Sequence, residues 1–170
     1  GGRVYGGELL LRQQFGRWFW GWVAYTLSRS ERQDRPGADY RLFDFDQTHV
    51  LTLIGSTRLP WELELGVRIR YVTGTPKTPV ERAVLDGDSG TYVPVSGEVN
   101  SERMPDFFQM DVRLDKTWFY DDWNLQGYIE VQNATNKTNG EGYSYNYDYS
   151  ERVVQSGLPI IPGFGLKAEF

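Results

Sequence analysis

A strict alternation of apolar and polar residues constrains this chain more than any other feature. From residue 61 the sequence reads WELELGVRIRY, and the same pattern returns in FQMDVRLDKTW and in LQGYIEVQN. Successive side chains of a β-strand point to opposite faces, so each of these segments has one apolar face and one polar face. No segment with the period of a helix interrupts the series. The pattern predicts an all-β chain of antiparallel strands.

We predict seven such strands, at residues 3–14, 18–32, 49–59, 63–79, 106–119, 124–135 and 159–170. Their connections alternate in length. Residues 15–17, 60–62 and 120–123 form short connections, whereas residues 33–48, 80–105 and 136–158 form long ones. Short periplasmic turns and long extracellular loops are the usual asymmetry of outer-membrane barrels. Since no linker or repeat divides the chain, residues 1–170 are predicted to form one unit.

A soluble sandwich or a lipocalin-like barrel is the alternative, because any half-buried antiparallel sheet alternates in this way. The charges on the polar faces favour a membrane barrel, since a wet lumen accommodates closely spaced residues of both signs. The residues predicted to face the lumen or a plug are Glu64, Arg68, Arg70, Asp111, Arg113, Asp115 and Glu130. A cross-strand ladder in which these charges satisfy one another is an equally open interpretation.

Aromatic residues near the short connections also favour a bilayer, because amphipathic rings are enriched at membrane–water interfaces. The clustered rings are Phe15, Trp18, Phe19, Trp20, Trp61, Trp118, Phe119, Tyr120 and Trp123. The chain also ends GFGLKAEF, an ending common in outer-membrane barrels. The residues that share one face of this predicted closing strand are Phe164, Leu166, Ala168 and Phe170.

Composition excludes several classes of protein. The mean hydropathy of -0.53 leaves no stretch able to span a bilayer as a helix. Cys is absent, which excludes disulfides, thiolate metal sites and a Cys nucleophile, and the net charge of -5 with interspersed signs excludes a nucleic-acid footprint. His49 is the single histidine, so neither a zinc site nor a Ser-His triad can be assembled, and we interpret it as a strand-start residue. We expect no metal, no cofactor and no catalytic residue.

Two loop segments are candidates for binding. In GYSYNYDYSER the tyrosines Tyr143, Tyr145, Tyr147 and Tyr149 are predicted to line one face of an extended segment. They would either stack on a sugar or chelate, anchor a partner protein, or pack a long hairpin against its neighbours. The segment DGDSG at residues 86–90 has the carboxylate spacing of a calcium loop, but it lacks the downstream Glu and is interpreted as a solvated turn.

Seven strands should not close alone, since seven is odd, bacterial single-chain barrels have an even number of strands and hydrocarbon does not tolerate open sheet edges. If the long loops face outward, both the first and the last strand run toward the periplasm. We therefore expect residues 1–170 to be the C-terminal portion of a larger barrel, with the remaining strands supplied by another chain or by a missing segment.

The sequence resembles the C-terminal end of a TonB-dependent outer-membrane receptor. The resemblance extends over nearly the whole chain and rests on GWVAYTLSRSE, FDFDQTHVLTLIGSTRLP, LELGVRIRYVTGTPKTPV, FQMDVRLDK, IEVQNATNKTN and SGLPIIPGFGLKAEF. It implies a barrel of about twenty-two strands, plugged by an N-terminal domain, in the bacterial outer membrane. Such receptors take up scarce nutrients such as iron chelates with energy passed by TonB through the plug. No plug domain and no TonB box are present in these residues.

Three functions are therefore compared. The first is the wall of a TonB-dependent receptor, whose partners would be outer-membrane lipid, the remaining strands, the plug and TonB. The second is a barrel that serves as a structural anchor or displays loops in a surface complex. An outer-membrane protease or lipase is the third, although no loop offers a nucleophile paired with a histidine.

Overall fold

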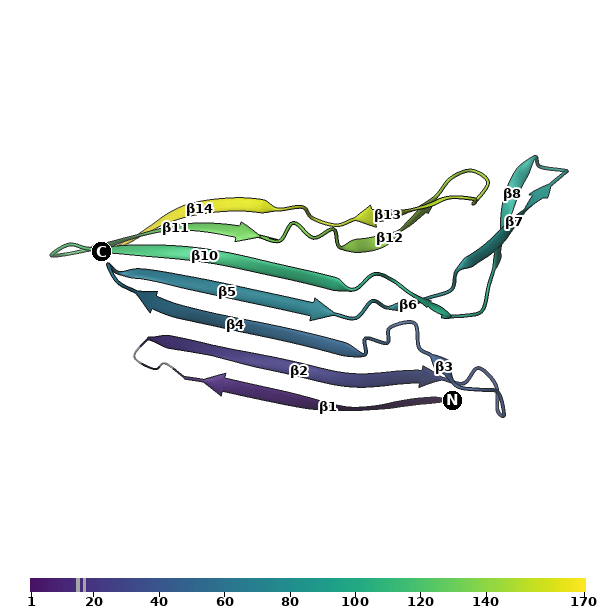
Figure 1. The fold of residues 1–170 in the computed structure, drawn as a ribbon, viewed down its shortest axis with the longest axis horizontal. Helices are drawn as coiled ribbons and strands as arrows, with labels where there is room; N and C mark the ends of the chain where they lie inside the picture. Colours follow the sequence, from purple (N-terminus) through teal and green to yellow (C-terminus); the bar gives the residue numbers. More distant parts are fainter. Residues whose placement is uncertain (15, 17) are drawn as a thin grey trace.

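The computed structural model describes residues 1–14, 16 and 18–170, and every regular element in them is a β-strand. The short connection predicted at residues 15–17, and Phe15 with it, lies largely outside this part of the chain. Seven long strands lie side by side (Figure 1). They are β1 (Gly2–Gln13), β2 (Phe19–Arg32), β4 (His49–Leu59), β5 (Leu63–Val72), β10 (Phe107–Phe119), β11 (Asn124–Gln132) and β14 (Ile161–Glu169).

These strands form one antiparallel sheet in the order β1-β2-β4-β5-β10-β11-β14, and the two-residue strand β3 (Arg41–Leu42) pairs with β2. The seven predicted strands are thus confirmed, and β4 begins at His49 as expected. Strands β1 and β14 each pair on one side only within the described residues, so the sheet is open. No helix in this part of the chain is long and apolar enough to cross a bilayer.

Two predicted strands end earlier than expected. The strand predicted to reach residue 79 stops at Val72, because the chain passes so close to Met104 that a Cβ at Gly74 would meet its carbonyl oxygen. The strand predicted to reach residue 135 stops at Gln132, since Asn133 adopts a φ of 50°. Phe170 lies just beyond β14.

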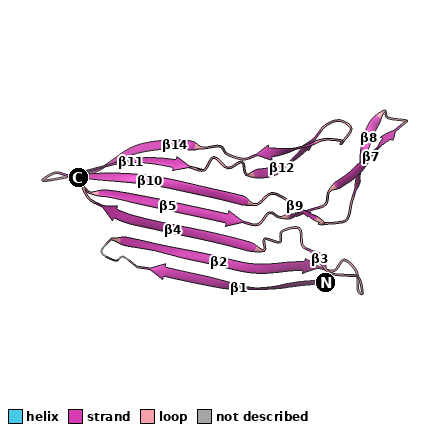
Figure 2. Ribbon diagram, in the orientation of Figure 1, coloured by secondary structure: helices cyan, strands magenta, loops and turns pink. Residues whose placement is uncertain are grey.

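The long connections, predicted as loops, contain short strands of their own. β7 (Val80–Asp86) pairs with β8 (Thr91–Ser96), and β12 (Gly140–Tyr145) pairs with β13 (Arg152–Ser156). β6 (Pro76–Lys77) pairs with β9 (Glu102–Arg103). All of them lie at one end of the long sheet, while the short turns lie at the other end, beside the C-terminus (Figures 1 and 2).

The register keeps the two faces of the sheet separate over all the central strands. One apolar row joins Val67, Val112 and Val131 across β5, β10 and β11. The adjacent row, one residue along, places Arg113 opposite both Gly66 and Glu130. Because a slip of one residue would exchange the faces, this register is strongly specified by the alternation.

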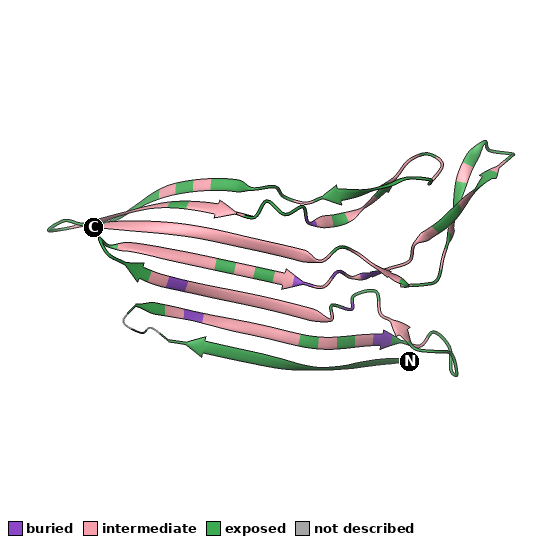
Figure 3. Cartoon of the chain, viewed as in Figure 1, coloured by how far each residue is buried: buried purple, intermediate pink, exposed green. Residues whose placement is uncertain are grey.

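The sheet has almost no buried apolar core. Val72 and Pro76 are the apolar side chains that are buried within the described residues, whereas Phe164 on the apolar face is 85% exposed and Ile129 is 61% exposed. Figure 3 shows the central strands as half-buried and the edge strands as exposed. Strands in substantial contact are hydrogen-bonded neighbours, so the main sheet is a single layer on which no other strand of the described residues packs. Such a face requires an apolar covering from elsewhere.

Candidate functional site

The charged residues predicted to face a lumen come together on one face of β5, β10 and β11. Arg68 and Asp111 are register partners, and the Arg68 Nη2 lies 2.5 Å from the Asp111 Oδ2. Gln109 and the backbone amide of Asn133 also donate hydrogen bonds to the Asp111 carboxylate. The Asp111 side chain is therefore fixed by three neighbours.

The second part of this ladder is centred on Arg113. Its guanidinium donates to Asp115 along the same strand at 2.8 Å and lies 3.6 Å from Glu130 on β11. The same guanidinium stacks 3.7 Å from the ring centroid of Tyr128. Gln126 adds a hydrogen bond to Asp115. This part of the face fits the self-satisfying ladder that the sequence left open.

The remaining two residues of the predicted set have different partners. The Glu64 carboxylate accepts hydrogen bonds from Ser56 Oγ and from the indole of Trp20. The Arg70 guanidinium lies 5.4 Å from the ring of Phe107. All seven predicted residues thus share the polar face, and most of their charge is compensated within it.

A buried ion pair at the loop end of the sheet was not predicted. The Asp46 side chain is fully buried, and its Oδ2 lies 2.5 Å from the Arg103 Nη2. Thr48 and the amide of Ser30 also donate to this carboxylate, while Arg103 donates to the carbonyl of Gly74. Burial opposes ionisation of Asp46, but the hydrogen bonds outweigh it, so the pKa of Asp46 is lowered.

Asp106 is the centre of a second group of hydrogen bonds beside this pair. Its carboxylate accepts a 2.7 Å hydrogen bond from the Tyr71 hydroxyl and another from the Gly74 amide. These bonds, the one from Tyr71 above all, lower the pKa of Asp106. Together the two carboxylates fasten the segments around residues 46, 74 and 103 to the ends of the strands. No sequence motif predicts such contacts, because the partners lie far apart in the sequence.

The tyrosine-rich loop differs from the prediction in its second half. Tyr143 and Tyr145 lie in β12, but the strand ends at Tyr145, and Tyr147 and Tyr149 lie in the tip of the hairpin, where Tyr149 has a φ of 60°. The four rings therefore do not line one face of an extended segment. The tip folds back because the Asp148 carboxylate accepts hydrogen bonds from Ser150, as an Asx turn does.

This folded tip forms one wall of a cleft of about 590 Å³, and the tip of the β7–β8 hairpin forms the other. The cleft is lined by Gly90, Thr91, Tyr92, Tyr145, Asn146, Tyr147 and Tyr149. Tyr92 and Tyr147 meet edge to face with ring centroids 5.9 Å apart, and Tyr145 and Tyr149 are 5.5 Å apart. Three of the four predicted tyrosines thus meet in the cleft, and Tyr92 was missed.

The segment at residues 86–90 is the exposed turn between β7 and β8, which confirms its interpretation as a turn. The Asp86 carboxylate accepts hydrogen bonds from Ser89 and from the Asp88 amide, and these bonds lower its pKa. No three His, Cys, Asp or Glu residues among those that the structure describes are grouped so that they could hold a metal ion.

Aromatic side chains gather at the short-turn end of the sheet. Trp123 stacks on Tyr120 at 4.4 Å and on Phe170 at 5.9 Å. Trp61 is 80% exposed in the turn after β4, with a φ of 65°. A bulky residue rarely adopts this left-handed conformation. Phe164, Leu166 and Ala168 of the closing strand lie on the apolar face, opposite Ile129, Gly127 and Leu125.

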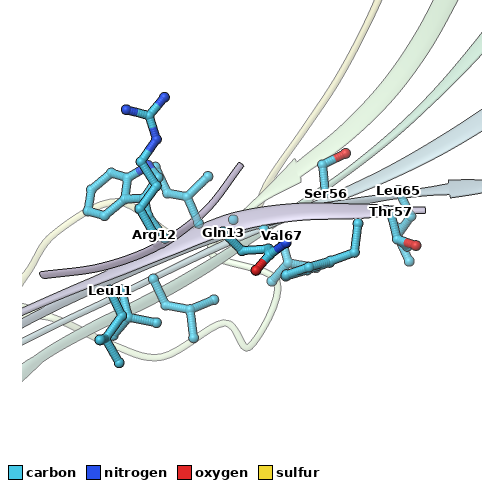
Figure 4. A pocket seen from close by; sticks show the side chains of 14 residues that line it. Leu11, Arg12, Gln13, Ser56, Thr57, Leu65 and Val67 are labelled. Carbon is cyan, nitrogen blue, oxygen red and sulfur yellow. The ribbon is translucent and has the colours of Figure 1, made fainter. Parts of the chain in front are cut away.

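An apolar groove of about 480 Å³ lies over β1, β2, β4 and β5 and is lined chiefly by side chains of the uncovered face, including Leu11 and Leu65 (Figure 4). Gly21 and Gly55 are register partners in it. The Phe19 ring lies against both, since a Cβ at Gly21 would meet its Cζ at 2.9 Å and one at Gly55 its Cε2 at 3.2 Å. Two glycines and one ring thus shape the groove.

No protein-family model matches the chain, and no match was found among curated proteins or among solved structures.

Proposed function

We propose that this chain forms part of the wall of a TonB-dependent receptor in the bacterial outer membrane. The observation that carries the proposal is the single-layer sheet whose apolar face is uncovered while its opposite face holds a ladder of charges. In a barrel the first face meets lipid and the second meets a lumen or a plug. The same chain in water would leave a broad apolar surface exposed.

The length of the apolar face supports this assignment. On β10 the outward series runs from Phe108 to Trp118. Ten steps of ~3.4 Å along a strand tilted by about 40° give a height of roughly 26 Å, which matches the apolar band of an outer-membrane barrel. Tyr71 and Phe108, which are register partners, mark one limit of the band, and Trp61 with Trp118 marks the other. Aromatic girdles are expected at these two levels.

Lys116 is the cation on the apolar face within this stretch, and its surroundings support the same orientation. Its ammonium group reaches the carbonyl oxygen of Trp61 in the short turn and lies 5.9 Å from the ring of Trp118. A lysine that extends its charged end toward an interface while its stem lies along apolar surface is a common feature of membrane proteins. The short turns would then face the periplasm.

The function proposed for the assembled receptor is uptake of scarce nutrients such as iron chelates. The sheet is open at β1 and β14, and a spanning sheet needs closed edges, so further strands would complete the barrel. The Arg68–Asp111 and Arg113–Glu130 pairs would line the lumen beside a plug through which TonB acts. The loop end, with its paired hairpins, would face the outside of the cell.

Single cysteines test the wall, because the chain has no Cys of its own. With the receptor reconstituted in bilayers, a water-soluble maleimide is expected to react with Arg113→Cys and not with Leu114→Cys, its neighbour on the other face. Reaction of both cysteines at equal rates, or a chain that stays soluble and monomeric without detergent, would contradict the proposal.

Uptake tests the transport role separately. A strain that lacks this chain is expected to lose energy-dependent accumulation of radiolabelled iron chelates, and expression of the complete receptor should restore it. If the chain spans the membrane and uptake is unchanged in the strain that lacks it, the anchor or loop-display role is favoured instead.

A further inference from the structure

We infer that the cleft between the two hairpin tips binds an uncharged, hydroxylated ring compound, and that a saccharide is the class of ligand it fits. The inference rests on the proposed function, which places these hairpins outside the cell. It concerns the cleft lined by Tyr92, Tyr145, Tyr147 and their neighbours, which the charged face of the sheet does not reach.

The size and shape of the cleft suit a small ligand. Its volume of about 590 Å³ lies within the range of roughly 300–1,000 Å³ that is usual for small-molecule sites. It opens between two hairpins from separate parts of the chain, so a ligand would contact both. Tyr147 is 81% exposed at the mouth, although its ring already meets Tyr92 edge to face. An exposed ring at the mouth of a cleft can stack on a ligand without displacing packed side chains.

The side chains that line the cleft indicate which class of ligand fits it. Four phenol rings provide apolar faces for the C–H face of a sugar ring, while Thr91 and Asn146 provide polar groups for its hydroxyls. The Tyr145 hydroxyl is buried in the wall and has no hydrogen-bond partner within the described residues. A hydroxylated ligand that reached it would satisfy a polar atom that is otherwise costly to bury.

Charge argues against an anionic chelate in this cleft. None of the seven lining residues is Lys, Arg, Asp or Glu. Two cations of the neighbouring elements already have partners, since Lys77 lies 4.0 Å from the ring of Tyr143 and Arg152 forms an ion pair with Glu102. Carboxylate-rich iron chelates are usually matched by cationic side chains, so a neutral ligand fits this lining better.

One wall of the cleft, the β12–β13 hairpin, has contacts with other elements and within its own tip. The Arg152–Glu102 pair joins the β12–β13 hairpin to β9, and Lys77 on β6 stacks on Tyr143 and Tyr145. Within the tip, Asn146 accepts a hydrogen bond from the Glu151 amide and donates one to Ser150. A wall that is already ordered loses less conformational entropy on binding.

The test uses the complete receptor in detergent micelles on an array of neutral oligosaccharides that includes linear glucans, mannans, xylans and galactans, with iron(III) citrate as the anionic comparison in solution. Binding to at least one neutral class is expected. Removing a stacking ring in Tyr147→Ser or Tyr92→Ser should weaken that binding by roughly tenfold each. Tyr40→Ser is the matched control, because Tyr40 is an exposed tyrosine of another loop that does not line the cleft, and it should leave binding unchanged.

The outcomes separate this inference from the proposed function. If the receptor inserts into bilayers with the expected face accessibility but binds no neutral oligosaccharide, or binds one equally well in both cleft variants, the saccharide site is wrong and the barrel wall stands. If the chain does not insert at all, the proposed function fails first. Binding of iron(III) citrate that is lost in Tyr147→Ser would likewise overturn the assignment to an uncharged ligand.

Discussion

Asp46 and Arg103 join two loops that are 57 residues apart, through a 2.5 Å contact between the Asp46 Oδ2 and the Arg103 Nη2. The carboxylate is fully buried, whereas the guanidinium remains partly exposed. A buried carboxylate needs a permanent cationic partner. This pair therefore fastens the loop end of the sheet to the segment that carries β9.

Replacing the cation should loosen these loops without disturbing the sheet. Arg103→Met leaves Asp46 buried without its charged partner, so we expect local opening to become easier by roughly 2 kcal/mol, or about thirtyfold in exchange rate. Hydrogen exchange of the Ser30 amide, which donates to Asp46, measures the effect. Arg152→Met is the control, because its pair with Glu102 is exposed and should contribute under ~1 kcal/mol. Equal protection in the Arg103 variant and the wild type would disprove the fastening role.

Acid should loosen the same loops. The folded protein lowers the pKa of Asp46 and of Asp106, so their contribution is complete above the ordinary aspartate pKa of about 3.9 and is lost as the pH falls through the lower folded values. A fluorophore on Val99→Cys, an exposed loop position, should show falling anisotropy only below about pH 4.

A variant that cannot titrate at position 106 tests whether Asp106 contributes to this acid response. Asp106→Asn keeps an oxygen that can accept the hydrogen bond from the Gly74 amide but no longer titrates. Its anisotropy should change less between pH 4 and pH 2 than that of the parent. A transition centred above about pH 5 in the parent would point to other groups than these two carboxylates.

The strands could be predicted because the alternation of apolar and polar residues is visible at each successive position of the sequence. In β5 and β10 every second residue belongs to a face, and the polar residues between them pair across the strands as the alternation implies. The β7–β8 hairpin was missed because its strands are short and do not alternate regularly, whereas the alternating tyrosines did indicate an extended segment where β12 lies. The Gly-containing turn at residues 86–90 between two β-rich runs was the signal that could have revealed β7 and β8.

The contacts of the loops could not be predicted in the same way. Asp46 contacts Arg103 only after the five strands between them have been placed, and Tyr92 contacts Tyr147 only after the four strands between them have been placed. Those pairings depend on the direction in which each hairpin leaves the sheet, which no local pattern encodes. The same reason explains the error at Tyr147 and Tyr149, which lie in the hairpin tip beyond β12 although the alternation continues through them in the sequence.

A close approach in the loops gives a sharper test of the structure. A Cβ at Gly74 would lie 1.8 Å from the Met104 carbonyl oxygen, so Gly74→Ala should force the two segments apart and destabilise the protein by roughly 1–3 kcal/mol. Gly87→Ala is the control, since nothing lies within 4 Å of the Cβ it would add. Thermal unfolding in detergent compares them. A variant at Gly74 as stable as the one at Gly87 would show that the segments around residues 74 and 104 are not in contact.

The turn between β4 and β5 offers a stabilising change. Glu62 has a φ of 57°, a conformation that glycine adopts at little cost and other residues adopt at about 1 kcal/mol or more. The strain that Glu62→Gly relieves exceeds the freedom that a glycine adds to the unfolded chain, so the free energy of unfolding should rise by up to about 1 kcal/mol. Glu8→Gly, at an exposed glutamate paired with Thr26 within β1, should instead lower it. Unfolding midpoints in detergent give both values, and a destabilised Glu62 variant would contradict the turn geometry.

The most direct test of the central claim is a spin-label scan along β10 in bilayers. Each residue from Phe107 to Phe119 is replaced in turn by a labelled cysteine, and collision with oxygen is compared with collision with a water-soluble nickel complex. We expect oxygen to dominate at positions 108, 110, 112 and 114, and to be lower at 109, 111, 113 and 115. If the two series show the same accessibility, or if the even positions are reached by the nickel complex, the apolar face does not meet lipid and the receptor-wall account is wrong.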